Sequence, residues 1–311
     1  MLDELDVKIL RSLISESVIA PSNIQLTSSL REIARKLNSD DMTIWKRFRK
    51  LQDAGYMSVW RLVVNPTMFG YMALDVRVEV QPESAKAEMI RKLGLVHGVI
   101  RIAEFYGPGL QILLLYNSEE SRSRTIELIS RITNTAKMKQ FRHALPMSLT
   151  KRLTETDMAI IHALAMDARK PYVTVAKELG FSSRTVKSRI DKLRSERTLF
   201  AVPELKMGDI PGLIPVVIYY SYAEGDVKDS VDRAMVSHFD ASYLWGMFSV
   251  PDQAYIVLSL SSMAEVQRSL NWTMEQPGVA TAQLDILVAV TGFPEKLGEL
   301  VTSRVPDIIA Q

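Results

Sequence analysis

No cysteine occurs among the 311 residues of the chain. This absence excludes disulfide bonds, thiolate-ligated zinc or iron–sulfur centres, and cysteine nucleophiles. Histidine is scarce as well, and none of the four residues stands in an HxxxH or HExxH spacing. We expect structural or surface roles for all four, and neither a metal site nor a cofactor. They are His97, His143, His162 and His238.

Long apolar runs are also absent. No run approaches the roughly 18–20 residues that a membrane-spanning helix needs. The opening residues MLDELD lack the basic and apolar regions of a secretory signal. Apolar residues make up 47% of the chain and charged residues 24%, which is ordinary for a globular protein and too apolar for disorder. We expect a cytoplasmic protein without a membrane partner.

The net charge of +2 conceals an uneven distribution. Residues 151–206 hold twelve Lys/Arg against seven Asp/Glu, whereas residues 207–311 hold five against thirteen. The two preceding segments, 1–65 and 66–150, are mildly basic. A polyanion would be attracted to residues 151–206 and repelled by the last third of the chain. If the protein binds nucleic acid, the last third is therefore not the binding surface.

The chain contains an internal repeat. LDELDVKIL at 2–10 returns as LTETDMAII at 153–161, an offset of 151 residues. Further matches lie 142 residues apart, so the first copy carries a nine-residue insertion after its opening helix. A repeat defines the folding unit before any single motif does, and each unit here is long enough to bury a core. We expect four domains, at 1–65, 66–150, 151–206 and 207–311.

The start of the second copy, from residue 153 to 206, predicts three short helices followed by a hairpin. Thr154 or Thr156 suits the N-cap of the first helix. The second helix should end at Gly180, because a left-handed residue costs glycine little. Ser182 is a natural N-cap for the third helix, and a wing strand is expected at 199–203. A helix, a glycine turn and a capped basic helix form the helix-turn-helix pattern.

The outward side of that third helix mixes hydroxyl groups with cations. Such side chains suit phosphate oxygens and base edges when a helix lies in the major groove. The alternative is a solvated cationic face, but the glycine turn, the cap and the positive segment charge favour DNA binding. The predicted contacts are Ser182, Ser183, Arg184, Thr185, Lys187, Ser188, Arg189 and Arg194.

The first copy has the same apolar frame with a different exposed face. Asp40 and Asp41 replace the two serines, and Met42 replaces Arg184. Carboxylates favour a helix N-terminus but repel phosphate, so we expect the second copy to bind DNA more strongly. Arg189→Ala should then weaken binding more than Arg47→Ala. The predicted contacts of the first copy are Thr43, Lys46, Arg47, Arg49, Lys50 and, in the hairpin expected after Gly55, Arg61.

These features resemble the Lrp/AsnC family of bacterial and archaeal transcription regulators. The resemblance lies in LxxxDxxIL near the start, the helix-turn-helix ending in RxxxL, the glycine-led hairpin, and Asn65-Pro66 with Phe69-Gly70. It covers essentially the whole chain, twice. It implies an α+β fold of two winged helix-turn-helix domains, each followed by a ferredoxin-like βαββαβ effector domain. The function it implies is sequence-specific binding of double-stranded DNA in transcription regulation, and we expect no enzymatic activity.

The remaining segments match the implied βαββαβ order twice. In the first half we expect strands at 74–80, 99–106, 110–116 and 138–145, with helices at 83–95 and 121–132. In the second half we expect strands at 214–222, 242–248, 254–260 and 280–288, with helices at 227–238 and 263–274. A tail at 294–309 should add a further helix.

An effector site is weakly indicated. Family members that bind amino acids usually carry a glycine and then an aspartate between the second and third strands. The first half offers Tyr106, Gly107 and Gly109 without an aspartate. The second offers Gly246 and Asp252 at a stretched spacing. A small-molecule effector such as an amino acid therefore stays an alternative to purely structural turns.

An enzymatic alternative also stays open. Siroheme decarboxylases resemble Lrp/AsnC proteins, pair two related subunits that are sometimes fused, and rely on histidine and arginine around the tetrapyrrole carboxylates. The second effector-type domain is acidic, which suits such a ligand poorly. Its candidate residues are Arg233, Arg268, His238, Lys228 and Lys296.

A third alternative is a sensor or scaffold without DNA contact, which Asp40 and Asp41 favour for the first copy. The assembly is open too. Units of the family dimerise through their effector sheets, so the two effector domains either pair within one chain as a pseudo-dimer or take part in a homodimer. Unequal recognition helices predict an asymmetric operator in both cases. Side-chain types alone define neither the operator, nor the effector, nor activation versus repression.

Overall fold

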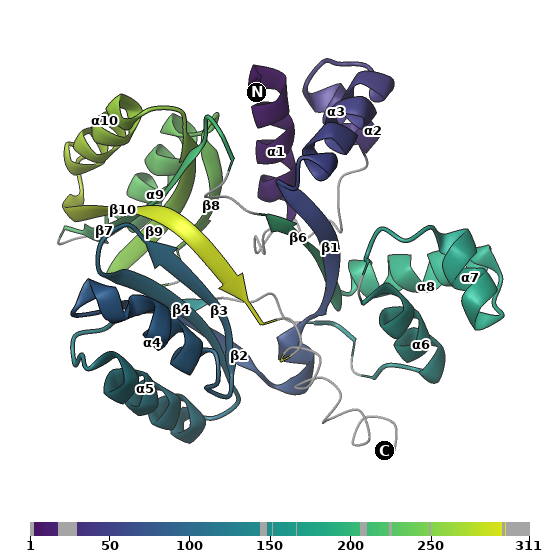
Figure 1. The fold of residues 1–311 in the computed structure, drawn as a ribbon, viewed down its shortest axis with the longest axis horizontal. Helices are drawn as coiled ribbons and strands as arrows, with labels where there is room; N and C mark the ends of the chain where they lie inside the picture. The colour runs from purple at the N-terminus through teal and green to yellow at the C-terminus, as the bar shows by residue number, and fades with distance from the viewer. Residues whose placement is uncertain are drawn as a thin grey trace. The chain divides into compact units, whose positions relative to one another are not determined.

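The chain forms a mixed α/β fold in two compact units, each assembled from both halves of the sequence (Figure 1). The computed structural model describes residues 3–17, 30–143, 148–150, 152–165, 167–205, 210–223, 226–248, 250–293 and 296. The first unit comprises residues 1–15, 73–144 and 206–292, and the second comprises 16–72, 145–205 and 293–311. None of the helices in the described ranges is long and apolar enough to cross a membrane.

An eight-stranded antiparallel sheet forms the framework of the first unit, with the order β5-β2-β4-β3-β10-β7-β9-β8. The strands are β2 (Met72–Glu79), β3 (Val99–Phe105), β4 (Gly109–Tyr116), β5 (Lys139–His143), β7 (Ile214–Tyr222), β8 (Tyr243–Met247), β9 (Gln253–Leu260) and β10 (Val279–Gly292). The helices are α1 (Glu4–Ser17), η2 (Glu83–Ala85), α4 (Lys86–Leu93), α5 (Glu119–Thr133), α9 (Lys228–His238) and α10 (Met263–Met274).

Strand–helix–strand–strand–helix–strand therefore occurs twice in this unit, in the order that the sequence predicts. The helix predicted at 83–95 is divided, because a short 3₁₀ turn, η2, precedes α4. The helix predicted at 294–309 lies outside the described residues, apart from Lys296.

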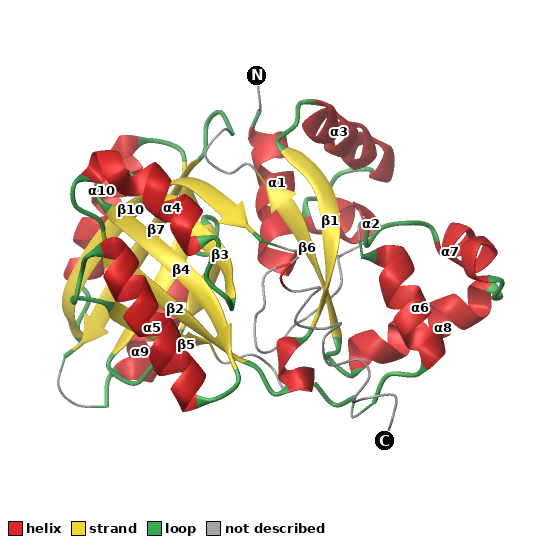
Figure 2. Ribbon diagram, turned by 60° about the horizontal axis from the view of Figure 1, so that its bottom comes forward, coloured by secondary structure: helices red, strands yellow, loops and turns green. Residues whose placement is uncertain are grey.

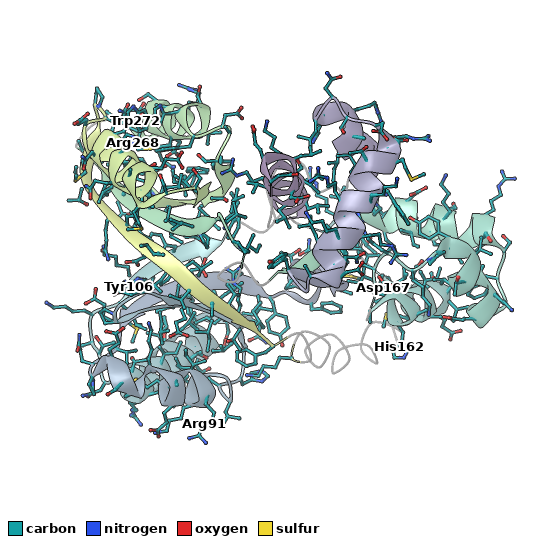
Figure 3. All side chains as sticks on the ribbon, turned by 45° about the horizontal axis from the view of Figure 1, so that its top comes forward. Arg91, Tyr106, His162, Asp167, Arg268 and Trp272 are labelled. Atoms are coloured by element: carbon teal, nitrogen blue, oxygen red, sulfur yellow. The ribbon has the colours of Figure 1, made fainter. Side chains whose placement is uncertain are left out.

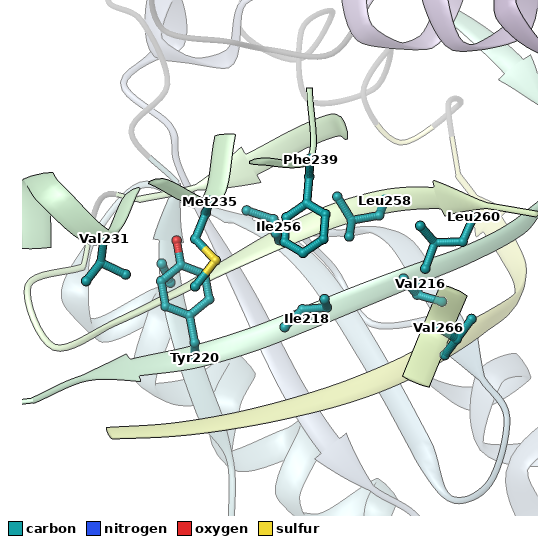
Figure 4. Packing of buried hydrophobic residues seen from close by; sticks show 11 residues of the cluster. Val216, Ile218, Tyr220, Val231, Met235, Phe239, Ile256, Leu258, Leu260 and Val266 are labelled. Atoms are coloured by element: carbon teal, nitrogen blue, oxygen red, sulfur yellow. The ribbon is translucent and has the colours of Figure 1, made fainter. Parts of the chain in front are cut away.

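Side chains alternate between the two faces of each half-sheet. On β7 and β9, one face packs against α9 and α10: Val216, Ile218 and Leu258 form a core with Met235 and Phe239 (Figure 4). In the first half, α4 and α5 lie over the corresponding face of the strands (Figure 2). Each half-sheet therefore has one helix-covered face and one remaining face.

The remaining faces of the two half-sheets pack against each other. Tyr255 donates a hydrogen bond to Asp75 at 2.6 Å, and Arg77 Nε donates to Asp285 at 2.7 Å. The ring centroid of Phe141 lies 5.3 Å from that of Tyr255. The donors and acceptors belong to strands that are not sheet neighbours, so the sheet folds back on itself through the β3–β10 junction. The first half of the chain thereby faces the second.

The second unit contains the helix-turn-helix segments and a two-stranded sheet. Its helices are α2 (Leu30–Lys36), α3 (Asp41–Asp53), η1 (Pro66–Phe69), α6 (Glu155–Leu164), α7 (Tyr172–Leu179) and α8 (Ser183–Ser195). Its strands are β1 (Met57–Val64) and β6 (Leu199–Leu205).

The hairpin predicted in each copy is wrong. β1 and β6 are single strands that pair antiparallel with each other, so that Val64 lies opposite Leu199 and Arg61 opposite Val202. A lone strand leaves its backbone N–H and C=O groups unpaired, and the strand of the other copy satisfies them. Local sequence could not reveal this, because it specifies a strand and not the identity of its partner.

Candidate nucleic-acid interface

The approach to α8 has the predicted turn and cap. α7 ends at Gly180, whose φ of 71° lies in the left-handed region that favours glycine. Ser182 caps α8, because its Oγ accepts a hydrogen bond from the backbone N–H of Thr185 at 3.0 Å. Both predictions are confirmed. The inward side of α8 is also as predicted, with Val186, Ile190 and Leu193 buried.

The outward side of α8 exposes cations and hydroxyls to solvent. Arg184, Lys187 and Ser188 are all exposed. Arg184 and Lys187 are three residues apart and so lie close together on one helix face. Neither forms an ion pair with any residue in the described ranges. These two charges are therefore available to a partner outside the protein.

Two other predicted contacts on α8 have partners within the domain. Arg189 Nη1 lies 3.7 Å from Oδ1 of Asp157, a buried carboxylate on α6. Arg194 lies 3.8 Å from Asp191 and is hydrogen-bonded to Tyr172. Both arginines therefore contribute to holding the three helices together, which the charge pattern alone did not indicate.

α3 presents a more apolar face at the equivalent positions. Its N-cap Asp40 accepts a hydrogen bond from the backbone N–H of Thr43 at 2.8 Å. Met42 is 58% exposed and Trp45 47% exposed, and the guanidinium of Arg49 lies 5.4 Å from the Trp45 ring centroid. Met42 and Trp45 precede Arg184 and Lys187 by 142 residues in the repeat.

The other predicted contacts of the first copy are placed as follows. Lys46 and Lys50 are exposed and Arg47 is partly exposed on α3. Arg61 lies on β1, and its side chain is outside the described residues. In the second copy, Ser183 and Thr185 lie in the first turn of α8.

The residues predicted for an effector in the first half lie at the β3–β4 turn. Tyr106 is 80% exposed, and Gly107 has a φ of 81°. A Cβ on Gly109 would lie 2.5 Å from the guanidinium of Arg77, so the close approach of that side chain accounts for the glycine. Lys86 donates hydrogen bonds to the backbone carbonyls of Phe105 and Gly107, which fixes the turn.

A similar structural reason applies to Gly246 in the second half. A Cβ there would lie 2.4 Å from the Phe248 ring. Asp252 is exposed at the start of β9, and its backbone carbonyl accepts a hydrogen bond from Tyr222 N–H at 3.1 Å. An effector role for these residues stays a prediction.

A cleft that the sequence did not predict lies in the first unit. It has a volume of about 860 Å³ and is lined by α1, the end of α9, the end of β9, and α10. Arg268 and Trp272, four residues apart on one face of α10, stand beside each other in its wall (Figure 3). That spacing was the available signal, but it gained meaning only when α1 and α9 were placed opposite α10.

The cleft contains two of the five residues considered for a tetrapyrrole ligand, His238 and Arg268. Lys228 instead forms an ion pair of 2.5 Å with Asp232, and Arg233 is exposed on α9. No group of three or more His, Asp or Glu that would hold a metal ion occurs in the described part of the chain.

Comparisons with known proteins agree with parts of this picture. The AsnC-type helix-turn-helix domain matches residues 153–194. The crystal structure of the siroheme decarboxylase NirDL is similar over 96% of this chain and 99% of that chain, with a TM-score of 0.55 and 12% identity. Its complex with an iron-uroporphyrin III analogue gives a TM-score of 0.53 over the same shares and identity. Escherichia coli AsnC covers 46% of this chain, with 93% of its own length, a TM-score of 0.31 and 18% identity. No curated protein sequence matches.

The likeness to NirDL corrects one expectation from the sequence. We expected a protein without enzymatic activity. That expectation is overturned, because an enzyme uses the same fold over nearly the full length of both chains. The match at residues 153–194 establishes an AsnC-type helix-turn-helix domain, which is the kind of domain that binds DNA.

Proposed function

We propose that this protein is a sequence-specific DNA-binding regulator whose main DNA contact is α8. The observation that carries the proposal is the pair Arg184 and Lys187, exposed on α8 without an ion-pair partner among the described residues. Phosphate neutralisation by such cations supplies most of the non-specific affinity of DNA-binding proteins. Ser188, exposed beside them, adds a hydroxyl that suits phosphate oxygens or base edges.

The two halves of the chain are proposed to form a tandem of equivalent units. Ser118 and Ser262, which cap α5 and α10, lie 144 residues apart. The same offset relates Asn134 and Gly278, the left-handed residues that follow these two helices. A constant offset through caps and turns supports a repeated unit, since those positions depend on local geometry.

Contacts between the half-sheets support pairing of the two units as a pseudo-dimer. Tyr255 donates to Asp75 across the interface. Exchanging each residue for the one 144 positions away gives Tyr219 and Gln111, and Tyr219 donates to Gln111. In a two-fold arrangement, contact i to j is accompanied by contact j to i, and this pair of hydrogen bonds follows that rule.

The charges at this interface suit unlike halves. Arg77 pairs with Asp285, and both side chains are at most one-tenth exposed. The positions equivalent to them are Ser221 and Phe141. Two first halves would oppose Arg77 to phenylalanine, and two second halves would oppose Asp285 to serine, each leaving a buried charge without its partner. The interface therefore favours one first half with one second half.

The DNA proposal is tested by binding to genomic fragments at two salt concentrations. We expect Arg184→Gln/Lys187→Gln to weaken binding strongly and to reduce the salt slope by about 1–2, one for each lost phosphate contact. The matched control, Arg91→Gln/Lys137→Gln, removes the same charge from exposed positions on and after helices of the other unit. Equal losses in both variants, or none in either, would refute the assignment to α8.

A second function is favoured by the near full-length likeness to NirDL, which is a siroheme decarboxylase. We infer that the same chain is a candidate for tetrapyrrole chemistry, with His238 and Arg268 in the cleft as the residues available to a carboxylate. Three carboxylates also line that cleft, Glu4, Glu265 and Glu275, which oppose a ligand with many carboxylates. A spectral titration with siroheme, followed by an assay for released carbon dioxide, decides this candidate, and an unchanged spectrum ends it.

A further inference from the structure

The cleft in the first unit has an aromatic wall. The His238 ring stacks on Trp272 with centroids 3.6 Å apart and planes 4° from parallel. Phe239 meets Trp272 edge-on at 5.2 Å. Desolvation lowers the pKa of His238, so its ring is neutral near pH 7 and adds to the flat, weakly polar surface. A planar ring has a stacking surface here.

Two arginines also line the cleft. Arg11 of α1 donates to the backbone carbonyls of Ala241 at 3.0 Å and Ser259 at 2.5 Å, while its buried Nε has no hydrogen-bond partner. Carbonyl oxygens hold the guanidinium without neutralising it, and burial lowers the pKa of Arg11. Arg268 is exposed on α10 and forms no ion pair within the described ranges. An anion in the cleft would therefore be stabilised.

Two of the three carboxylates that line the cleft already have partners. Glu265 accepts hydrogen bonds from the backbone N–H and the hydroxyl of Ser261, at 2.7 and 2.8 Å. Those bonds lower the pKa of Glu265. Glu4 forms an ion pair of 2.7 Å with Lys8. The groups left for a ligand are chiefly the guanidinium of Arg268 and the aromatic wall.

We propose that this cleft binds a small aromatic carboxylate, with its ring against His238 and Trp272 and its carboxylate at Arg268. The volume of about 860 Å³ lies within the range of small-molecule sites and leaves room for more than one ring. The equivalent positions of the first half, 144 residues earlier, carry Gly94 and Leu128, so only the second half has the aromatic wall. This site is independent of α8 and of the DNA proposal.

Calorimetric titration of the full chain tests the proposal with three probes: 1-naphthoate, its uncharged analogue 1-naphthamide, and acetate. Naphthoate should bind at least about tenfold more tightly than naphthamide, because only the acid forms charge-assisted hydrogen bonds. Acetate, which has no ring, should give no measurable binding. Equal affinity for acid and amide, or no heat with naphthoate at millimolar concentration, would overturn it.

Variants separate the two parts of the site. Arg268→Gln should weaken naphthoate about tenfold and leave naphthamide unchanged, whereas Trp272→Leu should weaken both. Arg233→Gln removes the same charge from an exposed position on α9 that does not line the cleft, and it should change neither. Thermal melts identify a variant that fails to fold; Arg268 is exposed, so its substitution keeps the test valid if Trp272→Leu is unstable. Unchanged naphthoate binding in Arg268→Gln would contradict the proposal.

Discussion

At the scale of single residues, the repeated motifs have structural as well as surface roles. The aspartate of LTETDMAII, Asp157, accepts hydrogen bonds from Thr154 N–H and its hydroxyl in a capping box. Its second oxygen faces Arg189, the arginine of the RxxxL motif. The two motif residues therefore connect the first and third helices of the domain. A charged residue on a recognition helix is not by that fact a DNA contact.

Arg189→Leu is expected to lower the free energy of unfolding by about 1–3 kcal/mol, because the buried oxygen of Asp157 loses its charged partner. Urea denaturation followed by circular dichroism measures the change. In a double-mutant cycle, Asp157→Asn should make the loss of Arg189 much less costly. Additive losses in the double variant would show that the ion pair does not couple the helices.

The ranking of Arg189 above Arg47 in DNA binding stays a prediction. Any loss of binding in Arg189→Ala would combine lost contact with lost stability. Arg184→Gln is the cleaner probe, because its side chain is exposed and unpaired within the described ranges.

At the scale of elements, α3 and α8 show how one frame carries two surfaces. Each has a capped N-terminus and an inward stripe of three buried residues. Outward, α3 carries Met42 and Trp45 where α8 carries Arg184 and Lys187. The helix forms from the stripe and cap that both share, while the affinity for a polyanion depends on the face that differs.

Transferring that face tests the comparison. Met42→Arg/Trp45→Lys should raise DNA affinity and steepen the salt dependence, by up to about two phosphate contacts. Anisotropy titrations at several salt concentrations measure both quantities. The control Met263→Arg/Met274→Lys adds the same charge to exposed positions on α10. If the α3 variant behaves like this control, α3 does not reach DNA.

The facing half-sheets illustrate pairing between elements far apart in the sequence. Arg77→Leu should destabilise the protein by about 3–5 kcal/mol, because Asp285 would be left buried without its cation. Arg77→Leu/Asp285→Leu should recover much of that loss, since neither charge then remains buried. Chemical denaturation compares the two. A double variant as unstable as the single one would assign the effect to packing instead of charge.

At the scale of the whole molecule, pairing of the two halves within one chain leaves no free copy of this sheet face. The hydrogen bonds of Asp75, Tyr255 and Tyr219 are all made inside the chain. A regulator built in this way needs no second chain to complete the sheet pairing, and its two unequal helix-turn-helix segments would read an asymmetric site.

Light scattering after size-exclusion chromatography should therefore give a mass near 35.0 kDa at micromolar concentration. Arg77→Leu, which weakens the pairing of unlike halves, is the informative comparison. A mass twice as large for the unmodified protein would favour the homodimer that the sequence left open.

The sequence by itself determined the local structure. Apolar spacing, caps and glycines defined α7, α8 and most strands, because these depend on neighbours within a few residues. The tertiary structure decided which distant groups meet. It paired β1 with β6 in place of two hairpins, gave Arg189 a partner in Asp157, and brought α1 beside α10 to form the cleft. Local propensity acts along the chain, whereas the partner of a strand edge or a buried charge is selected by packing across it, which short-range patterns do not encode.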